Sequence, residues 1–438
     1  MNKTLIKLAI LFLIVSSPAK SDFQTSKLLE GWDFRYKGFI IGAWWSPGAD
    51  DLELNLYKEA GFNVLIMSQY MNDMSDIDKA IKKLDYAKKY NLWVMFDTLT
   101  KNEEPWGGKK WVEPYENPFE HRASLEELKF LYDAVANHPA MLGFLLGDDQ
   151  GEITPRTKAC TDFLYQRPQP QLIPWLCGWI PPKNLAKFNN PFSNPQIYPP
   201  LNEWHLPSDM LAIKYISEYA KWSSECKKYG LVFWPMFYVQ GLPGTKYTFF
   251  PSDSLIRFPA YLAIAFGAKG IWYFHYGGSA FQNSLLKEES MDDRTKSCNY
   301  TPLYTIAKEV NNRIAFWGDY IVSRESTAIF STAFPENPEM KKIKGLKKPG
   351  IGSVIDAMDK YLIVGILEKK GENALAMVVD CRISKEWEDI PYREVSIYFS
   401  HRFKTIKILD CDQIKEIKGN GVKFNLKAGE GQLLELTR

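Results

Sequence analysis

The stretch SLEELKFLYDAVANHPAMLGFLLGDD (124–149) places an amphipathic helical pattern directly before an apolar run that ends in two adjacent aspartates. An apolar run without clean alternation is typical of a parallel strand whose two faces are both covered. A helix followed by such a strand is the repeating unit of α/β folds. This stretch therefore predicts an α/β fold, provided that the unit recurs.

The unit does recur along most of the chain. Strand-like runs occupy residues 38–47, 62–70, 92–99, 141–149, 172–180, 195–200, 231–240 and 270–276. Helical patterns lie between them, the clearest at 76–91, 124–139, 208–230 and 299–321. Gly61 and Gly230 stand where a helix C-cap glycine would directly precede a strand. Eight strand–helix pairs predict a (β/α)8 barrel over residues 38–323.

The helical periodicity stops near the end of this region. From residue 324 to 438 the chain consists of short alternating strands joined by turn residues, such as those at 370–373 and 419–421. Such a run of short strands predicts a separate antiparallel β-sandwich domain.

The first residues have the pattern of a secretion signal. Lys3 and Lys7 precede an apolar run from Leu8 to Val15, and a small-x-small triplet ends at Ser21. The alternative is an N-terminal membrane anchor, but the run is shorter than the roughly 20 residues that span a bilayer. We expect a signal peptide at 1–21, an N-terminal arm at 22–37, a secreted or periplasmic protein, and no membrane contact after cleavage.

The composition indicates which classes of ligand the protein is not expected to bind. Basic and acidic side chains nearly balance, 54 against 52, so the charge favours neither a nucleic acid nor an anionic membrane. The five histidines and six cysteines show no metal-ligand spacing, and no glycine-rich phosphate loop is present. We therefore expect neither a metal nor a cofactor. Cys381 and Cys411 could pair in the last domain, or all six cysteines could be buried apolar residues.

In (β/α)8 barrels the active site lies at the C-terminal ends of the strands. Aromatic and polar residues at the predicted strand ends are our candidates for substrate binding: Trp44, Trp45, Gln69, Tyr70, Asp97, Trp179, Tyr198, Tyr238, Gln240 and His275. Any one of these aromatic rings could equally belong to the core. Together, aromatic rings beside carboxylates suit a carbohydrate, whose apolar ring faces lie on aromatic surfaces while its hydroxyls need polar partners.

Three acidic residues are candidates for catalysis. Asp148 and Asp149 end the fourth strand, where the alternative role is to cap the helix expected from Ile153 onward. Glu152 or Thr154 could supply that cap instead. Glu203 lies in a proline-bounded loop after the sixth strand. It is either a solvent-exposed loop residue or the base of an inverting enzyme, in which the two carboxyl groups stand roughly 6.5–9.5 Å apart.

The segment HPAMLGFLLGDDQGE (138–152) resembles the fourth strand of glycoside hydrolase clan A barrels, in particular a secreted bacterial group with a G-Y-F-L-x-D-E-P-like pattern. GAKGIWYFHY (267–276) is similar to their eighth strand, and GEGQLLEL (429–436) to the close of the β-sandwich that often follows. The resemblance implies that the carboxylate at the tip of the fourth strand is the general acid/base.

The sequence departs from this family pattern at both catalytic positions. Asp149 replaces the expected glutamate and Gln150 the proline, while FWPMFYVQG (233–241) offers Gln240 where clan A enzymes carry the nucleophilic glutamate. The predicted function is a secreted glycoside hydrolase acting on a poly- or oligosaccharide, in which Asp149, with or without Asp148, protonates the leaving oxygen. The alternative, favoured by Gln240, is a non-catalytic carbohydrate-binding protein on a degenerate glycosidase barrel.

Overall fold

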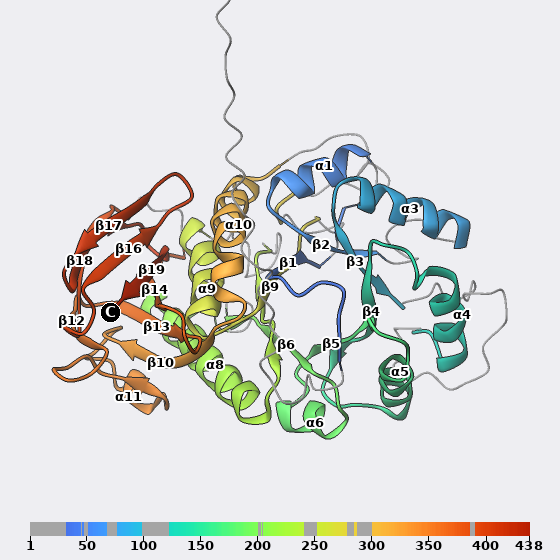
Figure 1. Cartoon of the computed structure of the whole chain (residues 1–438), viewed down its shortest axis with the longest axis horizontal. Helices are drawn as coiled ribbons and strands as arrows, with labels where there is room; N and C mark the ends of the chain where they lie inside the picture. Colours follow the sequence, from blue (N-terminus) through green and yellow to red (C-terminus); the bar gives the residue numbers. More distant parts are fainter. Residues whose placement is uncertain are drawn as a thin grey trace, which may run out of the picture.

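The computed structural model describes residues 32–44, 46–47, 51–67, 77–98, 122–199, 203, 205–240, 252–277, 284–286, 300–385 and 390–438. The predicted signal peptide at 1–21 lies outside these residues, as do Trp45, Gln69 and Tyr70. Figure 1 shows an α/β domain and an all-β domain side by side.

The α/β domain is a closed parallel barrel. Its strands are β1 (Ile40–Ala43), β2 (Val64–Met67), β3 (Trp93–Asp97), β4 (Met141–Gln150), β5 (Ile173–Gly178), β6 (Phe192–Ile197), β7 (Val232–Phe233), β8 (Met236–Tyr238) and β9 (Gly270–Phe274). They pair in the order β5-β4-β3-β2-β1-β9-β8-β6-β7, and a β5–β6 pairing closes the ring. The two short strands β7 and β8 share the seventh position, separated by Trp234 and Pro235. The predicted (β/α)8 barrel is confirmed.

Helices cover the outside of the barrel (Figure 1). They are α1 (Asp51–Glu59), α3 (Ile77–Lys89), α4 (Leu125–Val135), α5 (Pro155–Tyr165), α6 (Pro182–Lys187), α8 (Ser208–Tyr229), α9 (Asp253–Ala265) and α10 (Pro302–Ile321). Gly230 is the left-handed C-cap of α8, with φ at 69°, as its position in the sequence predicts. None of the helices in the described residues is long and apolar enough to cross a membrane.

The sixth strand begins earlier than its apolar pattern suggests. The apolar pattern predicts a strand at 195–200, whereas β6 runs from Phe192 to Ile197. Ser193 and Asn194 are buried polar residues within it, and Asn194 donates a hydrogen bond to the carbonyl of Trp234 inside the barrel. Buried polar residues give no hydrophobic signal, so the sequence pattern missed the start of this strand.

Large side chains fill the barrel interior. The indole rings of Trp175 and Trp272 stack with centroids 4.2 Å apart, and Trp44 meets Trp175 edge-on at 6.0 Å. Gly42 makes room for them, because a Cβ at this position would lie 2.3 Å from the ring of Trp272. The barrel is therefore a packed core rather than a pore, and a ligand can reach only its rim.

The all-β domain is an antiparallel sandwich, as predicted. The larger sheet contains β11 (Leu346–Lys347), β10 (Glu325–Ser331), β13 (Leu362–Glu368), β14 (Ala374–Asp380), β19 (Gly431–Thr437), β16 (Thr405–Leu409) and β17 (Ile414–Lys418). The smaller sheet contains β12 (Ile355–Met358), β15 (Arg393–Phe399) and β18 (Gly421–Leu426). The short helix α11 (Pro338–Lys342) precedes β11. The predicted boundary at residue 323 falls between α10 and β10.

The sandwich packs against α9 and α10 of the barrel (Figure 1). Gly365 of β13 lies directly on α9, since a Cβ there would fall 2.0 Å from the carbonyl oxygen of Ala265. On α10, the indole N–H of Trp317 donates to the carbonyl of Leu409 at 2.9 Å, and Arg313 pairs with Glu430 at 2.6 Å. These contacts place the sandwich beside the barrel wall, on the side away from α4 and α5 (Figure 1).

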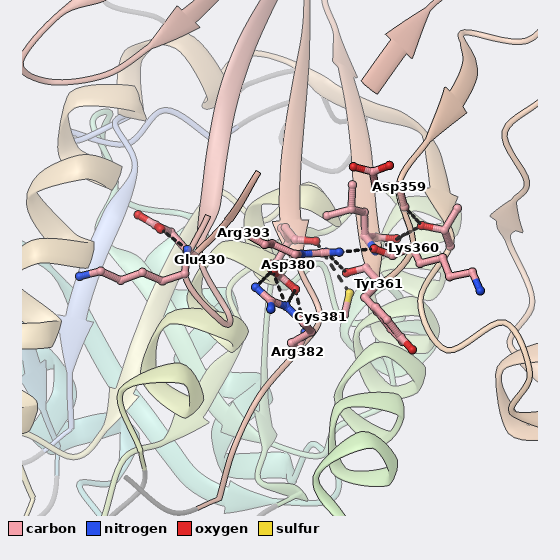
Figure 2. Close-up of polar contacts among 12 residues, drawn as sticks. Asp359, Lys360, Tyr361, Asp380, Cys381, Arg382, Arg393 and Glu430 are labelled. Atoms are coloured by element: carbon pink, nitrogen blue, oxygen red, sulfur yellow. Dashed lines mark hydrogen bonds and ion pairs between the residues drawn. The ribbon is translucent and has the colours of Figure 1, made fainter. Parts of the chain in front are cut away.

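A buried carboxylate joins the two sheets of the sandwich (Figure 2). Asp380 at the end of β14 is fully buried and pairs with Arg382 at 2.7 Å and with Arg393 of β15 at 2.9 Å. Arg393 also donates to the carbonyl of Lys360 at 2.8 Å. The buried charge is thus compensated by two guanidinium groups, as buried charges must be.

The cysteines of the sandwich do not pair. Cys381 is free and buried, and Cys411 is free and exposed. The predicted alternative of a Cys381–Cys411 disulfide is therefore wrong, and so is the alternative in which all six cysteines are buried. Burial raises the pKa of the Cys381 thiol well above its usual value, so this thiol stays protonated.

Candidate functional site at the barrel rim

The two aspartates at the end of β4 do not cap the helix that follows. Thr154 is the N-cap of α5, and it forms a reciprocal capping box with Thr157. The hydroxyl of Thr154 accepts from the backbone N–H of Thr157 at 3.2 Å. Thr154 therefore fills the helix-capping role that was the alternative for Asp148 and Asp149.

The backbone turns both aspartates to the same side of the sheet. Consecutive residues of a regular strand point to opposite faces. Asp149 instead adopts the left-handed conformation, with φ at 51°, and the β4–β5 register shifts between Gly147 and Gln150. As a result, the Oδ1 atoms of Asp148 and Asp149 lie 3.2 and 2.7 Å from the same nitrogen, Nε2 of Gln196 on β6. The two carboxylates form a pair on one amide donor.

Gly178 at the end of β5 accommodates this irregularity. Its φ is 137°, a region that residues with a side chain rarely adopt. A Cβ at Gly178 would lie 2.4 Å from both the backbone nitrogen and the carbonyl oxygen of Gln150. The next residue, Trp179, donates its backbone N–H to the Gln150 carbonyl at 2.7 Å. A glycine is therefore required beside the aspartate pair.

Gln196 is a central residue of the site that sequence reasoning missed. It lies within the predicted strand 195–200, and its buried amide also contacts Cys177 Sγ at 3.5 Å. Burial, and then the charge of Asp148, raise the pKa of Cys177 well above its usual value. Cys177 is therefore a protonated thiol and not a nucleophile. A polar residue next to a strand end was the available signal for Gln196.

Three aromatic rings form a wall beside the aspartate pair. Tyr198 after β6 lies 5.8 Å from Tyr238 of β8 and 5.1 Å from Phe274 of β9, measured between ring centroids. Tyr198 is half-buried and Tyr238 is buried, and burial raises the pKa of both phenols. Both hydroxyls therefore remain protonated and can donate hydrogen bonds. Phe274 was not predicted as a site residue.

Trp179 offers the exposed aromatic surface of the site. Its side chain is 48% exposed, and its indole N–H donates to the carbonyl of Gln196 at 3.3 Å. The ring lines a groove of about 650 Å³ between α6 and α8, together with Tyr198, Glu203 and Trp222. Trp44, by contrast, is buried in the barrel interior against Trp175.

Two further carboxylates that were predicted for the rim each form an ion pair. Asp97 is buried and pairs with Arg122 at 2.5 Å. Glu203 is partly exposed, and its Oε1 lies 3.0 Å from Nζ of Lys214 on α8. Glu203 and Gln196 line the same groove, but Asp148 and Asp149 are not among its lining residues.

Two buried polar residues follow the last barrel strands. Gln240 comes after β8 and is only 2% exposed, and its Nε2 has no hydrogen-bond partner within the described part of the chain. His275 directly follows β9, and its ring lies 5.0 Å from that of Phe274. Trp45, Gln69 and Tyr70, also predicted for this rim, lie outside the described residues.

Among the described residues, one group of three His, Cys, Asp or Glu side chains is close enough to share a metal ion. It consists of Asp410, Cys411 and Asp412, between β16 and β17 of the sandwich. This group belongs to the other domain and contributes nothing to the rim of the barrel.

No family model and no curated protein matches the chain. Solved structures do match it. One is a catalytic mutant of a GH42 β-galactosidase from G. stearothermophilus, with a TM-score of 0.55 and 10% identity over 93% of this chain and 99% of that one. Another is a family 5 glycoside hydrolase from Bacteroides vulgatus, with a TM-score of 0.55 and 12% identity over 96% and 94%. Over nearly its whole length, this chain therefore has the fold of these two glycoside hydrolases.

Proposed function

We propose that the protein is a glycoside hydrolase that cleaves a poly- or oligosaccharide, with Asp149 as the general acid. The observation that carries this proposal is the aspartate pair on one side of the β4 tip, at the barrel rim and not engaged in helix capping. The fold shared with two glycoside hydrolases is consistent with it.

The surroundings of the pair suit a sugar. Asp149 is exposed, so it can exchange its proton with solvent and reach a bound glycosidic oxygen. The exposed ring of Trp179 offers a flat apolar surface for a sugar ring. The Tyr238 hydroxyl and the Gln240 amide, buried and without partners among the described residues, are donors for sugar hydroxyls.

Glu203 remains a candidate for the base of an inverting reaction. Its ion pair with Lys214 weighs against this role, because one carboxylate oxygen is already engaged by the ammonium group. The signal-peptide pattern at 1–21 supports export, so the proposed substrate is a saccharide outside the cytoplasm.

The test is release of reducing sugar from a panel of polysaccharides by the wild type and by Asp149→Asn. We expect the variant to lose about 10²–10⁴-fold in rate, the usual contribution of a general acid. Glu152→Gln is a matched control, because Glu152 is an exposed carboxylate in the same loop. Release that survives in Asp149→Asn would refute the assignment.

The second candidate is a carbohydrate-binding protein without activity. The observation in its favour is the amide of Gln240 at the end of the seventh barrel strand. Saccharide binding by the wild type without release of reducing sugar at any pH would establish this candidate instead.

A further inference from the structure

We propose that the groove between α6 and α8 binds those sugar units of an uncharged saccharide chain that lie beyond the bond cleaved at the aspartate pair. The inference rests on the proposed function and adds two properties of the substrate: it is a chain of several sugar units, and it carries no net charge. In this proposal the groove, and not the rim alone, determines which saccharides are bound.

The groove begins at the rim of the barrel. α6 and α8 are neighbours on the outside of the barrel (Figure 1). Trp179, Tyr198 and Glu203 follow the C-terminal ends of β5 and β6 and line this part of the groove. Gln196 connects the groove to the aspartates, because it lines the groove while its Nε2 lies 2.7 Å from Oδ1 of Asp149. A chain that is cleaved at Asp149 can therefore continue into the groove.

The groove is long enough for more than one sugar ring. On α8 it is lined by one face of the helix, formed by Lys214, Glu218, Lys221, Trp222 and Glu225. The span from Lys214 to Glu225 covers roughly 16 Å at the rise of an α-helix. The volume of the groove, about 650 Å³, is within the range of about 300–1,000 Å³ that is typical of small-molecule sites. These dimensions suit a chain of several units better than a single sugar.

Trp179 provides a fixed aromatic surface at the rim end of the groove. Its side chain is 48% exposed, and its indole N–H donates to the carbonyl of Gln196 at 3.3 Å. Its backbone N–H donates to the carbonyl of Gln150 at 2.7 Å. Because the residue is already held, little conformational entropy is lost when a sugar ring stacks on it. Further apolar side chains extend the surface: Pro181, Pro182, Ile197, Tyr198 and Pro199.

The charges along the groove are compensated. Each of the five charged side chains among the described lining residues forms an ion pair: Glu203 with Lys214 at 3.0 Å, Glu218 with Lys221 at 3.7 Å and Glu225 with Lys228 at 4.0 Å. Lysines do not outnumber glutamates there, so the electrostatic field offers an anionic chain no net attraction. The paired groups can still exchange hydrogen bonds with hydroxyls, since each has more than one bonding position. Apolar surface beside paired polar groups therefore favours a neutral saccharide.

The test is the affinity for β-1,4-linked gluco-, manno-, xylo- and galacto-oligosaccharides of two to six units. Calorimetry is carried out with Asp149→Asn, so that the ligand stays intact. We expect the Kd of at least one series to fall about tenfold or more from two units to six, because the added rings enter the groove. Oligogalacturonates of the same lengths, with a carboxylate on each unit, should bind about tenfold more weakly than that series.

Glu218→Leu tests whether the groove recognises the length of the chain. Added to Asp149→Asn, it removes a charged hydrogen-bond partner from the middle of the α8 face and should weaken binding of the six-unit ligand by about tenfold. Glu126→Leu in the same background is the matched control. Glu126 of α4 also pairs with a lysine three residues later, Lys129 at 3.9 Å, but it does not line the groove. We expect this control to keep the dependence on length.

The outcomes separate the inference from the proposed function. Binding that strengthens with length in the control, and much less in Glu218→Leu, supports the inference. Affinity independent of length, equal effects of the two variants, or equal or tighter binding of the oligogalacturonates overturns it.

Hydrolysis of the same saccharides by the wild type is measured separately. Cleavage together with affinity independent of length overturns the inference and leaves the glycosidase function intact. Binding that depends on length, without cleavage, keeps the groove and overturns the glycosidase function. Absence of both binding and cleavage overturns both.

Discussion

Nε2 of Gln196 lies 2.7 Å from Oδ1 of Asp149, although the two residues are 47 positions apart in the chain. The same nitrogen lies 3.2 Å from Oδ1 of Asp148. One neutral donor therefore orients both carboxylates of the aspartate pair, and the residues around it provide separate tests of that arrangement.

Gln196→Leu should reduce kcat by about 10²-fold with a smaller change in KM, because it releases the carboxylates from a fixed position without removing them. Steady-state kinetics on a cleaved glycoside is the measurement. Gln150→Leu is the matched comparison, since Gln150 bonds the backbone carbonyl of Asp148 and not a carboxylate. A loss in Gln150→Leu as large as in Gln196→Leu would show that the shared donor has no special role.

Gly178→Ala should destabilise the protein by about 1–3 kcal/mol and reduce hydrolysis, because a Cβ there meets the backbone of Gln150 in a strained conformation. Urea unfolding and activity per folded molecule would measure the two effects. The control is Gly151→Ala, whose Cβ would have nothing within 4 Å. Equal stability of the two variants would argue against the close approach of β4 and β5.

Asp97→Asn separates a structural role from the predicted role in substrate binding. Because Asp97 pairs with Arg122 in a buried position, the substitution leaves a buried guanidinium without its counter-charge. We expect a loss of about 3–5 kcal/mol in the free energy of unfolding, with activity per folded molecule largely retained. A variant of normal stability with impaired substrate binding would instead favour direct contact with the substrate.

Trp179→Ala should raise KM by about tenfold and change kcat little, because the exposed ring contributes stacking area and no proton transfer. Tyr392→Ala on the sandwich is the control, as its side chain is 59% exposed and lies in the other domain. The comparison requires kinetics with an oligosaccharide. An unchanged KM in Trp179→Ala would remove this ring from the substrate-binding surface.

Lys269 lies at the end of the barrel opposite the aspartate pair, and it makes the free energy of unfolding depend on pH. It is buried at the start of β9 and donates to the carbonyls of Ile321, at 3.3 Å, and Arg324. Burial lowers its pKa from 10.5 to about 8. Between these two values the unfolded chain binds a proton that the folded chain does not, so this lysine adds to stability as pH rises through that window.

The measurement is urea unfolding of the wild type and of Lys269→Met from about pH 7.5 to 10. The difference in the free energy of unfolding should move in favour of the wild type by about 1.4 kcal/mol per pH unit within the window. The contributions of the other titrating groups are the same in both proteins and therefore cancel in this difference. A difference that stays constant with pH would contradict the lowered pKa.

The sequence alone determined the architecture and led to the proposal that the site lies at the rim of the barrel. Hydrophobic periodicity is a local property, so eight helix–strand pairs and a run of short alternating strands were readable without coordinates. The aspartates at the tip of β4 and the ring of Trp179 followed from the rule that parallel strands end at one rim. The same rule also selected Trp44 and Asp97 as rim candidates. Both side chains are buried, because the exposure of a side chain depends on the packing around it.

Only the tertiary structure decided what each rim residue can do. The left-handed turn at Asp149, the glycine that allows it and the amide of Gln196 come from three different strands, β4, β5 and β6. Arg122 engages Asp97, 25 positions away, and Lys214 of α8 engages Glu203 in the loop that precedes this helix. The physical reason is that the orientation and charge of a carboxylate depend on neighbours brought by strand pairing, which no local pattern encodes.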